Sequence, residues 1–489
     1  MKPFIHKFKT QSNNYIYDVN TNQFIKVNSV VYDIIEDWNI LTPQEIISKW
    51  REKYKVKEIN SAIQQIQLFF YKGHFTSYRP KKMWRPNFEE GLREVLNSNV
   101  NMLILNITEK CNLRCKYCVY SGTYYYERSH SNRSMGEKII EKALNFYFNN
   151  ELYNADIKCI SFYGGEPLLE FEKIKNIVEY VSKNFKNKSS FSMTTNGTLL
   201  NEEIIKFLIK YSFFLLISLD GPSEIHDKYR VTANGKTTFG KIINNLRLIK
   251  KLSPEYYQSK VSFSVTIPPN VSPIKIDEFF ENFDIVKEKN LQVSYIVPWD
   301  TKFFKIYGNY DSMYYKEIEE LREKYIKNRI NNKEPSSLQK ALFEKILITI
   351  HKRNINVLRD IAPANGICIP GQRKVFVSID GKFFPCERIG EFRNFNIGDI
   401  ERGLDLQKVK NLIENYILNS EKECLSCWAV RLCDLCYVST KRGDLMDFER
   451  KKEICINHKN FLNRMFITYA TIMENNPNAF DFTKNVKIV

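Results

Sequence analysis

Short apolar runs alternate with amphipathic helical patterns through the middle of this 489-residue chain. Apolar side chains recur at helical spacing in residues 135–150, 171–185 and 201–211. Such strand–helix repeats favour a parallel sheet, and six of them predict an α/β fold with a partial or complete parallel barrel. Active-site loops of such barrels follow the C-terminal ends of the strands. The six strand candidates are Met102–Ile107, Ile157–Tyr163, Phe191–Thr195, Leu215–Leu219, Val261–Ile267 and Leu291–Val297.

Residues 1–85 have a different pattern, which predicts a small separate unit of strands followed by helices. Strand-like runs occur at Phe4–Phe8, Tyr15–Asp18 and Phe24–Val27, with turn-forming residues between them. Three helical patterns follow, VYDIIEDW, TPQEIISKWREKY and IQQIQLFFYKG, the last of which ends at Gly73. A generic winged-helix domain that only packs on the rest of the chain would have the same pattern.

The chain is too long for one ordinary core, and the remaining pattern divides it further. A linker with a short helix is expected at residues 80–100. The strand–helix region then occupies 86–300, a charged helical bridge 301–365, a second cysteine-bearing region 366–465, and a tail with a short helix and a polar end 466–489.

Three cysteines, Cys111, Cys115 and Cys118, follow the first predicted strand in the run CNLRCKYC. Thiolates this close in sequence cannot bridge one another without strain, but they can hold three irons of a [4Fe–4S] cube. Because no fourth cysteine is nearby, the fourth iron would stay open to a small-molecule chelate. A structural zinc knuckle is the alternative, and it would need a fourth ligand such as His130, which follows a polar loop.

Seven later cysteines have the spacing C-x17-C, C-x2-C-x5-C-x2-C and C-x18-C, which suits two further metal sites. Two zinc sites are the alternative, because C-x2-C pairs also bind zinc. Cys159, in the apolar run IKCISFYGG, is expected in the buried core. Glu387 is a candidate base or substrate contact, or simply a surface carboxylate. The seven cysteines are Cys368, Cys386, Cys424, Cys427, Cys433, Cys436 and Cys455.

Glycines and small polar residues follow the later strands, where a ligand would bind. The paired glycines of GGEP, Gly164–Pro167, would let the backbone come close to a ligand. Asn196 in TNG, with Ser218 and Asp220 in SLDG, could hydrogen-bond that ligand, and Arg230 could pair with a carboxylate. Turn and capping chemistry is the alternative for Asn196 and Asp220.

The cysteine motif followed by GGEP resembles the radical S-adenosylmethionine (SAM) superfamily. This resemblance implies a partial (β/α)6 barrel and a [4Fe–4S] cluster whose open iron binds the amino and carboxylate groups of SAM. It implies that Gly164, Gly165 and Pro167 bind the SAM amino group, with Glu166 supporting their loop.

The same resemblance implies that Asn196, Ser218 and Asp220 meet the ribose hydroxyls and the methionine carboxylate of SAM. Arg230 would form an ion pair with that carboxylate. Tyr117 would flank the adenine, and surface packing is its alternative role.

The later cysteines resemble the SPASM extension of peptide-modifying radical SAM enzymes, which holds two auxiliary [4Fe–4S] clusters. By order, Cys424, Cys427, Cys433 and Cys455 would hold one cluster, whereas Cys368, Cys386 and Cys436 would hold the other. The segment PANGI before Cys368 offers no fourth cysteine. The second of these clusters would therefore have an open iron or a ligand other than cysteine.

The N-terminal unit resembles the PqqD-like element that recognises leader peptides by strand addition. The runs CVYSGTYYYERSHSNRSM and GICIPGQRKVFVSIDGKFFPCERIG resemble Clostridium-type maturases of Cys-rich, bacteriocin-like peptides, which form the thioethers of ranthipeptides and sactipeptides. The resemblance implies an enzyme that modifies a ribosomally made precursor peptide after hydrogen abstraction by a 5′-deoxyadenosyl radical. A flavodoxin or ferredoxin would supply electrons.

Other functions stay open at this point. Epimerisation, carbon–carbon crosslinking and formylglycine formation use similar cores, and a non-catalytic Fe–S or zinc regulator is an alternative of another class.

The composition of the chain also indicates where the protein is located and which partners it binds. The net charge is +17, but the lysines are scattered along helices and no Arg-rich arm is present, so nucleic acid is not an expected partner. The basic start MKPFIHKFK precedes no apolar segment, and no run of 18 apolar residues occurs, so we expect a cytoplasmic protein without a membrane span. The exposed clusters that the cysteines imply favour an anaerobic cell.

Overall fold

The computed structural model describes residues 1–87, 102–149, 158–185 and 189–485. The short helix expected at residues 80–100 lies largely outside these ranges. No helix in the described part of the chain combines the length and apolar character that crossing a membrane requires.

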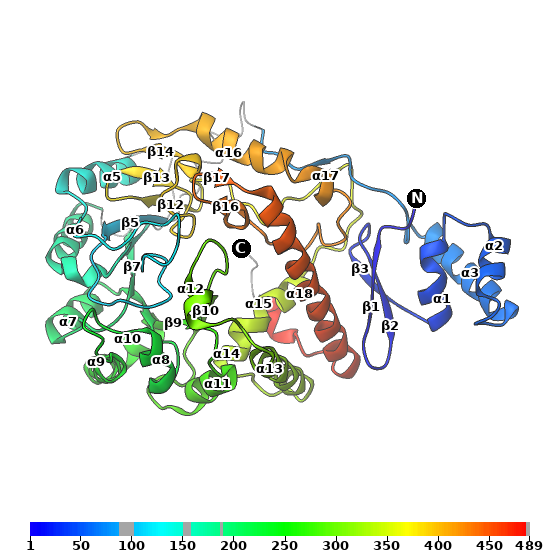
Figure 1. Cartoon of the computed structure of the whole chain (residues 1–489), viewed down its shortest axis with the longest axis horizontal. Coiled ribbons are helices and arrows are strands. Elements are labelled where there is room, and N and C mark those ends of the chain that lie inside the picture. The colour runs from blue at the N-terminus through cyan, green and yellow to red at the C-terminus, as the bar shows by residue number, and fades with distance from the viewer. Residues whose placement is uncertain (88–101, 150–157, 186–188, 486–489) are drawn as a thin grey trace.

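A ten-stranded sheet forms the centre of the molecule, and the six successive parallel strands β5 to β10 confirm the predicted fold (Figure 1). Neighbouring strands follow one another in chain order, as right-handed strand–helix repeats require. The six are β5 (Met102–Thr108), β6 (Lys158–Gly164), β7 (Ser189–Thr195), β8 (Phe214–Ser218), β9 (Val261–Ile267) and β10 (Leu291–Tyr295).

Helices cover the outer face of these strands (Figure 1). Their inward stripes are apolar, as in α6, where Ile174, Ile177, Val178 and Val181 are buried at helical spacing. These helices are α5 (Glu137–Asn149), α6 (Phe171–Asn184), α7 (Glu202–Lys210), α8 (Ser223–Tyr229), α9 (Phe239–Leu252), α10 (Pro254–Lys260) and α11 (Pro273–Asn282).

The second cysteine-bearing region continues the same sheet, which the sequence analysis did not anticipate. Strand β12 (Lys374–Val377) pairs in parallel with β5, with Phe376 opposite Ile104. Three short antiparallel strands then extend the sheet. They are β13 (Lys382–Phe384), β14 (Gly398–Asp399) and β15 (Gly403–Leu404).

Helices and short strands complete the C-terminal half. The expected boundary between residues 465 and 466 falls inside the long helix α18 (Phe448–Asn475). The other elements are β4 (Lys82–Met83), α12 (Phe303–Tyr307), α13 (Ser312–Ile330), α14 (Ser337–Gln339), a π-helical turn at Lys340–Glu344, α15 (Lys345–His351), β11 (Ile361–Ala362), α16 (Leu406–Leu418), α17 (Glu421–Cys424), β16 (Lys441–Arg442) and β17 (Leu445–Met446).

The N-terminal unit has the predicted order of three strands followed by three helices. Thr42 and Glu45 form a capping box at the start of α2, in which each side chain accepts a hydrogen bond from the other residue's backbone N–H. One face of its sheet forms a small core with these helices. The elements are β1 (Ile5–Lys9), β2 (Asn14–Asp18), β3 (Gln23–Val27), α1 (Ser29–Ile34), α2 (Pro43–Trp50) and α3 (Val56–Tyr71).

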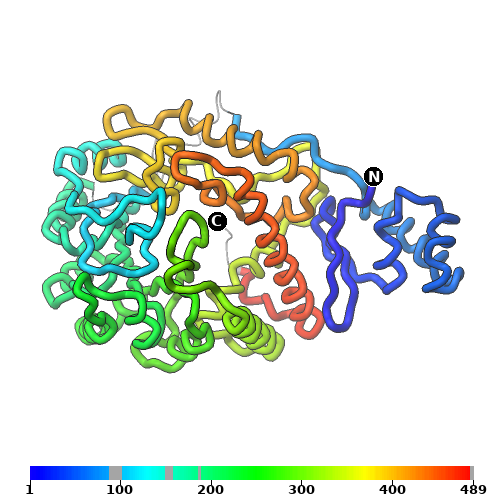
Figure 2. Tube along the Cα trace, viewed as in Figure 1, coloured from blue at the N-terminus to red at the C-terminus, as the bar shows by residue number. Residues whose placement is uncertain are grey.

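The other face of this sheet packs on α18, which runs back from the barrel toward the N-terminal unit (Figure 2). The ring of Phe466 lies 5.0 Å from that of Tyr17 and 4.7 Å from that of Phe24, between ring centroids. His6 stacks on Trp428, with 3.7 Å between centroids and 10° between ring planes. The sheet is therefore buried on both faces and docked on the region of the later cysteines.

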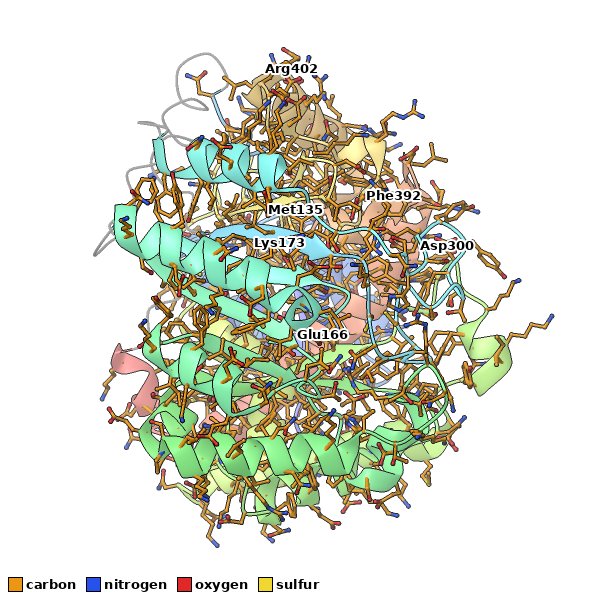
Figure 3. The ribbon with its side chains drawn as sticks, turned by 90° about the vertical axis from the view of Figure 1, so that its left-hand side faces the viewer. Met135, Glu166, Lys173, Asp300, Phe392 and Arg402 are labelled. Carbon is orange, nitrogen blue, oxygen red and sulfur yellow. The ribbon has the colours of Figure 1, made fainter. Side chains whose placement is uncertain are left out.

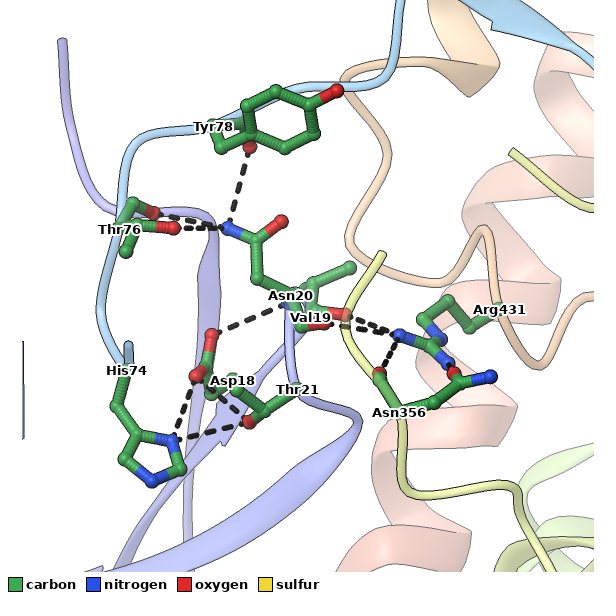
Figure 4. A network of polar contacts seen from close by, with 9 residues as sticks. All are labelled: Asp18, Val19, Asn20, Thr21, His74, Thr76, Tyr78, Asn356 and Arg431. Carbon is green, nitrogen blue, oxygen red and sulfur yellow. Dashed lines mark hydrogen bonds and ion pairs between the residues drawn. The ribbon is translucent and has the colours of Figure 1, made fainter. Parts of the chain in front are cut away.

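A polar network fixes the same interface (Figure 4). The Arg431 guanidinium donates to the backbone carbonyls of Val19, Asn20 and Asn356, at 3.4, 3.1 and 2.8 Å. On the other side of the β2–β3 turn, the buried Asp18 carboxylate accepts hydrogen bonds that include one from Thr21 Oγ1 at 2.8 Å. Because Arg431 lies between Cys427 and Cys433, the network ties the N-terminal unit to a cysteine-bearing loop.

Replacing Arg431 with alanine should loosen the N-terminal unit. The turn carbonyls would lose a charged donor, and such a hydrogen bond contributes about 1.5–3 kcal/mol. Hydrogen exchange of the β2–β3 turn should accelerate, while that of β5–β9 stays unchanged. Arg402→Ala is the matched control, because Arg402 is exposed and pairs only locally with Asp399. Unchanged exchange in the turn of R431A would contradict this role of Arg431.

Candidate functional site

The three cysteines of the first motif line a loop directly after β5. All three thiols are free and half-buried. The backbone N–H groups of Leu113 and Tyr120 donate to the sulfurs of Cys111 and Cys118, each at 3.4 Å. The guanidinium Nη1 of Arg230 lies 3.9 Å from Cys115 Sγ. Each sulfur thus has a donor that favours a thiolate.

These thiols also act on one another. Burial, with a contribution from the neighbouring Cys115, raises the pKa of Cys111 to about 11. Burial raises the pKa of Cys118 to about 12, again with a contribution from Cys115. Three buried thiols that repel one another as anions would need a strongly cationic partner to deprotonate them. The positive irons of a cluster meet that requirement, so these residues fit the group that the motif implies.

No three His, Cys, Asp or Glu side chains in the described ranges converge closely enough to hold a single metal ion. The thiolates of a [4Fe–4S] cube bind different irons, so such convergence is not required of them.

The GGEP loop packs against the backbone of the cysteine loop. A Cβ added to Gly164 would lie 2.2 Å from the carbonyl oxygen of Thr108, and one added to Gly165 would lie 2.0 Å from that of Lys110. The N–H groups of Gly165 and Glu166 donate to those same two oxygens, each at 2.8 Å. The close approach that these glycines permit is therefore to the cysteine loop itself.

The buried side chain of Glu166 links the ends of β6 and β7 (Figure 3). Its carboxylate accepts hydrogen bonds from Thr195 Oγ1 at 2.7 Å, Asn196 N at 2.7 Å and Leu168 N at 3.1 Å. Burial raises the pKa of Glu166, and these donors lower it. The expected supporting role of Glu166 has a physical basis here, because its side chain holds the loop in place.

Asn196 combines the turn role with a contact to the cysteine loop. Its Oδ1 accepts from the N–H of Thr198 at 2.9 Å, and its Nδ2 donates to Asn112 Oδ1 at 2.9 Å. Asn112 in turn donates to Thr198 Oγ1 at 2.9 Å. Sequence reasoning missed Asn112, whose only signal is its position directly after Cys111.

The buried Asp220 carboxylate has three partners within the protein. It accepts from Arg230 Nε at 2.8 Å, from Thr266 N at 2.9 Å and from the hydroxyl of Tyr117. Arg230, whose pairing with the carboxylate of SAM stays a prediction, is held by Asp220 through its Nε. Tyr117, expected beside the adenine, is buried against Arg230, and Ser218 is buried at the end of β8. Asp220 thus orients the arginine that approaches Cys115.

A cavity of about 900 Å³ occupies the inner side of the sheet. Closed parallel barrels fill this space with bulky branched side chains. Here the lining strands carry small hydroxyl residues that leave it open, namely Ser161, Ser192, Thr194, Ser262, Ser264 and Ser294.

The seven later cysteines influence one another electrostatically within two sets. Cys433 is influenced electrostatically by Cys455, Cys424 and Cys427. Cys368 is influenced by Cys386 and Cys436, and burial raises its pKa to about 12. We refer to these as the four-cysteine group and the three-cysteine group.

A chain neighbour of the three-cysteine group lines the cavity. Glu387, directly after Cys386, lines the cavity, and its carboxylate lies 3.3 Å from Lys374 Nζ. Tyr163 also lines it, and burial raises the pKa of this phenol, with further contributions from Glu387, Cys118 and Cys386. Tyr163 therefore lies within electrostatic range of both the first cysteine motif and the three-cysteine group.

Cys159 is half-buried, so the expected core position is wrong. Its Sγ lies 3.7 Å from the Oγ of the cavity residue Ser192. Alternation along β6 places Cys159 on the same face as Ser161 and Tyr163, which line the cavity.

Sequence reasoning also missed a charged group beside Tyr120, which lines the cavity. The guanidinium of Arg128 lies 3.8 Å from the ring centroid of Tyr120, and its Nε lies 3.2 Å from Glu109 and 3.6 Å from Glu391. Burial raises the pKa of Glu391, and Arg128 opposes this. Glu391 follows β13, far along the chain from the segment between β5 and α5 that carries the others, so no local pattern predicts their meeting.

Comparisons with known proteins agree with this arrangement. Residues 105–283 match the sequence profile of the radical SAM superfamily. A cysteine-type anaerobic sulfatase-maturating enzyme of Clostridium novyi is 27% identical over 68% of this chain and 87% of its own length. The radical SAM cyclopropyl synthase TigE of Paramaledivibacter caminithermalis is 23% identical over 94% of this chain and 91% of its own. The structure of native anSMEcpe with bound AdoMet is similar in fold, with a TM-score of 0.56, 24% identity, and coverage of 80% of this chain and 100% of that one.

Replacing Gly165 with alanine should disrupt the GGEP loop, because the new methyl group would meet the Lys110 carbonyl. We expect the affinity for SAM, measured by calorimetry on the reconstituted protein, to fall at least about tenfold, which is about 1.4 kcal/mol. Gly240→Ala is the control, since a Cβ there meets no atom within 4 Å. Equal SAM affinity in G165A and the wild type would show that the loop packing is not needed.

Proposed function

We propose that this chain, which belongs to the radical SAM superfamily, modifies a ribosomally made Cys-rich precursor peptide and forms thioether links between a Cys sulfur and a carbon of another residue. Membership of the superfamily implies a [4Fe–4S] cluster and SAM as cofactors. The observation that supports the thioether proposal is the lining of the cavity. Val119 and Tyr120, which directly follow the first cysteine motif, line it together with Glu387, which directly follows Cys386 of the three-cysteine group.

The residues assigned to the first cofactor are those of the cysteine loop and its supports. Cys111, Cys115 and Cys118 would hold the cluster, and the GGEP loop with the ends of β7 and β8 would bind SAM. When bound, the cluster and SAM supply the 5′-deoxyadenosyl radical that removes a hydrogen atom from a substrate carbon. Glu166 and Asp220 keep the two rims of this site fixed before any ligand enters, so that little ordering remains to be done on binding.

The three-cysteine group would receive the substrate cysteine. Cys368, Cys386 and Cys436 leave one position of an auxiliary cluster for a further ligand, and a thiol from the cavity can reach the group beside Glu387. The Oε atoms of Glu387 would accept the proton of that thiol. Lys374, at 3.3 Å, holds this carboxylate in place on the cavity wall.

The cavity walls would position an extended peptide. Hydroxyl groups on β6, β7, β9 and β10 can donate to or accept from a peptide backbone whatever its side chains. Tyr120, Tyr124 and Trp299 line the cavity as well and would contact the peptide and help to exclude water. The cavity therefore suits a peptide whose position is set by its backbone.

The N-terminal unit would recognise the leader of that peptide. Its sheet has the order β1-β2-β3, so each outer strand has one edge without a paired strand in the described part of the chain. An extended leader could add to such an edge. The overall charge of +17 would favour an acidic leader, with binding that weakens as salt increases.

Carbon–carbon bond formation on a peptide is the second candidate. It is supported by the similarity to a cyclopropyl synthase, which extends over 94% of this chain. Formylglycine formation is the activity that the sulfatase-maturating relatives suggest. These three reactions leave different numbers of free thiols in the substrate peptide. The mass and thiol content of the product therefore distinguish them.

The test is to incubate the reconstituted enzyme with SAM, a reductant and Cys-rich precursors encoded near its gene, and then to alkylate the product. A thioether product should be lighter than the precursor by two hydrogens and should have lost one alkylatable thiol per crosslink. A product that lost two hydrogens but kept every thiol would favour carbon–carbon bond formation instead. Loss of sulfur would indicate formylglycine, and deuterium uptake without other change would indicate epimerisation.

The control is a precursor whose cysteines are replaced by serine, which should remain unmodified while SAM cleavage continues. A leaderless precursor should be processed more slowly than the full-length one. Equal processing of both would argue against leader recognition.

A further inference from the structure

Helix α18 carries a lysine that points at the four-cysteine group. Lys451 is buried, and its Nζ lies 3.8 Å from the Sγ of Cys424. The same Nζ lies 5.2 Å from the ring centroid of Tyr416. No carboxylate lies within ion-pair distance of this ammonium in the part of the chain that the structure describes.

A buried ammonium group without an anionic partner destabilises the fold, and proteins avoid it. The anion available to Lys451 is the sulfur of Cys424, together with the other thiolates of the four-cysteine group. Its chain neighbour Lys452 is placed as most lysines are, partly exposed and paired with carboxylates. Lys452 has a half-exposed side chain and pairs with Glu449 at 2.7 Å and Glu423 at 3.6 Å.

The three-cysteine group has charges of both signs beside it. The residue directly after Cys386 is Glu387, whose carboxylate lines the cavity, and Lys374 at 3.3 Å pairs with that carboxylate, so that this lysine is shared with an anion, unlike Lys451. A cation beside a cluster stabilises its reduced, more negative state, and a carboxylate does the reverse. The two groups are also close along the chain, because only Asp434 and Leu435 separate Cys433 from Cys436.

We propose that Lys451 raises the reduction potential of the four-cysteine site above that of the three-cysteine site, which makes the four-cysteine site the final acceptor of the electron that the substrate loses. This inference rests on the proposed function. When a substrate carbon radical and a thiol form one carbon–sulfur bond, the S–H bond breaks, and one proton and one electron are released. Glu387 takes the proton. The electron passes to an oxidised iron–sulfur cluster, away from the cavity in which the radical reacts.

The test compares the reduction potentials of the later sites in full-length, anaerobically reconstituted protein. Cys111, Cys115 and Cys118 are changed to alanine so that only the later sites contribute to the electron paramagnetic resonance signal. Into this background we would introduce Lys451→Met, which keeps the length of the side chain without its charge. Lys451→Arg retains a cation, and Lys452→Met removes the neighbouring exposed charge.

In K451M, the ratio of reduced to oxidised cluster at one site should fall about tenfold at a fixed applied potential, a shift of about 59 mV for a one-electron couple. K451R and K452M should keep the wild-type potentials. Unchanged potentials in K451M, or an equal shift in K452M, would overturn the role of Lys451.

The iron content of each variant is measured before its potentials. It distinguishes an effect of the charge of Lys451 from an effect of its packing. Loss of iron from the four-cysteine site in K451M but not in K451R would support the need for a cation there. Loss in both variants would show that Lys451 acts by packing and would overturn the proposal. Zinc in place of iron at the later cysteines of the otherwise unchanged chain would instead refute the proposed function itself.

Discussion

Two buried carboxylates at the C-terminal rim of the sheet hold the site together. Glu166 takes three hydrogen-bond donors from β7 and its own loop, and Asp220 takes three from Arg230, Thr266 and Tyr117. Between them lies the cysteine loop, against which the GGEP backbone packs so closely that Gly164 and Gly165 cannot carry a side chain. A buried carboxylate without hydrogen-bond donors would destabilise the fold. Glu166 and Asp220 are therefore stable in these positions only when the loops that supply their donors are in place.

The sequence predicts the central sheet well because its signals are local. Each of the six parallel strands is a short apolar run between helical patterns, and β9 has the predicted bounds Val261–Ile267. Strand β12 was missed because its pairing with β5 joins residues far apart in the chain. The division of the later cysteines into two groups was implied by the resemblance to the SPASM extension. By contrast, the partners of Arg230 and Asp220 depend on how β8, α8 and β9 meet, which no local pattern encodes.

The cavity shows a further limit of sequence reasoning. Hydroxyl residues at alternate positions of β7 and β9 could mark a solvent-facing strand, and only the curvature of the sheet turns them toward the cavity. Cys159 was assigned to the core because its neighbours are apolar, yet the alternation of β6 turns it to the same side as Ser161. Small polar residues on the inner face are what distinguish this sheet from a filled barrel, and they give it room for a peptide.

The central claim is that a substrate cysteine enters this cavity and reaches the three-cysteine group. The most direct test is pulsed electron paramagnetic resonance on protein in which Cys111, Cys115 and Cys118 are changed to alanine. The sample would contain a bound precursor that carries carbon-13 at the Cβ of its cysteines. The account predicts a carbon-13 coupling on one auxiliary cluster, which is absent with a precursor that has serine at those positions. Identical spectra with and without the labelled precursor, under conditions where the peptide is bound, would contradict it.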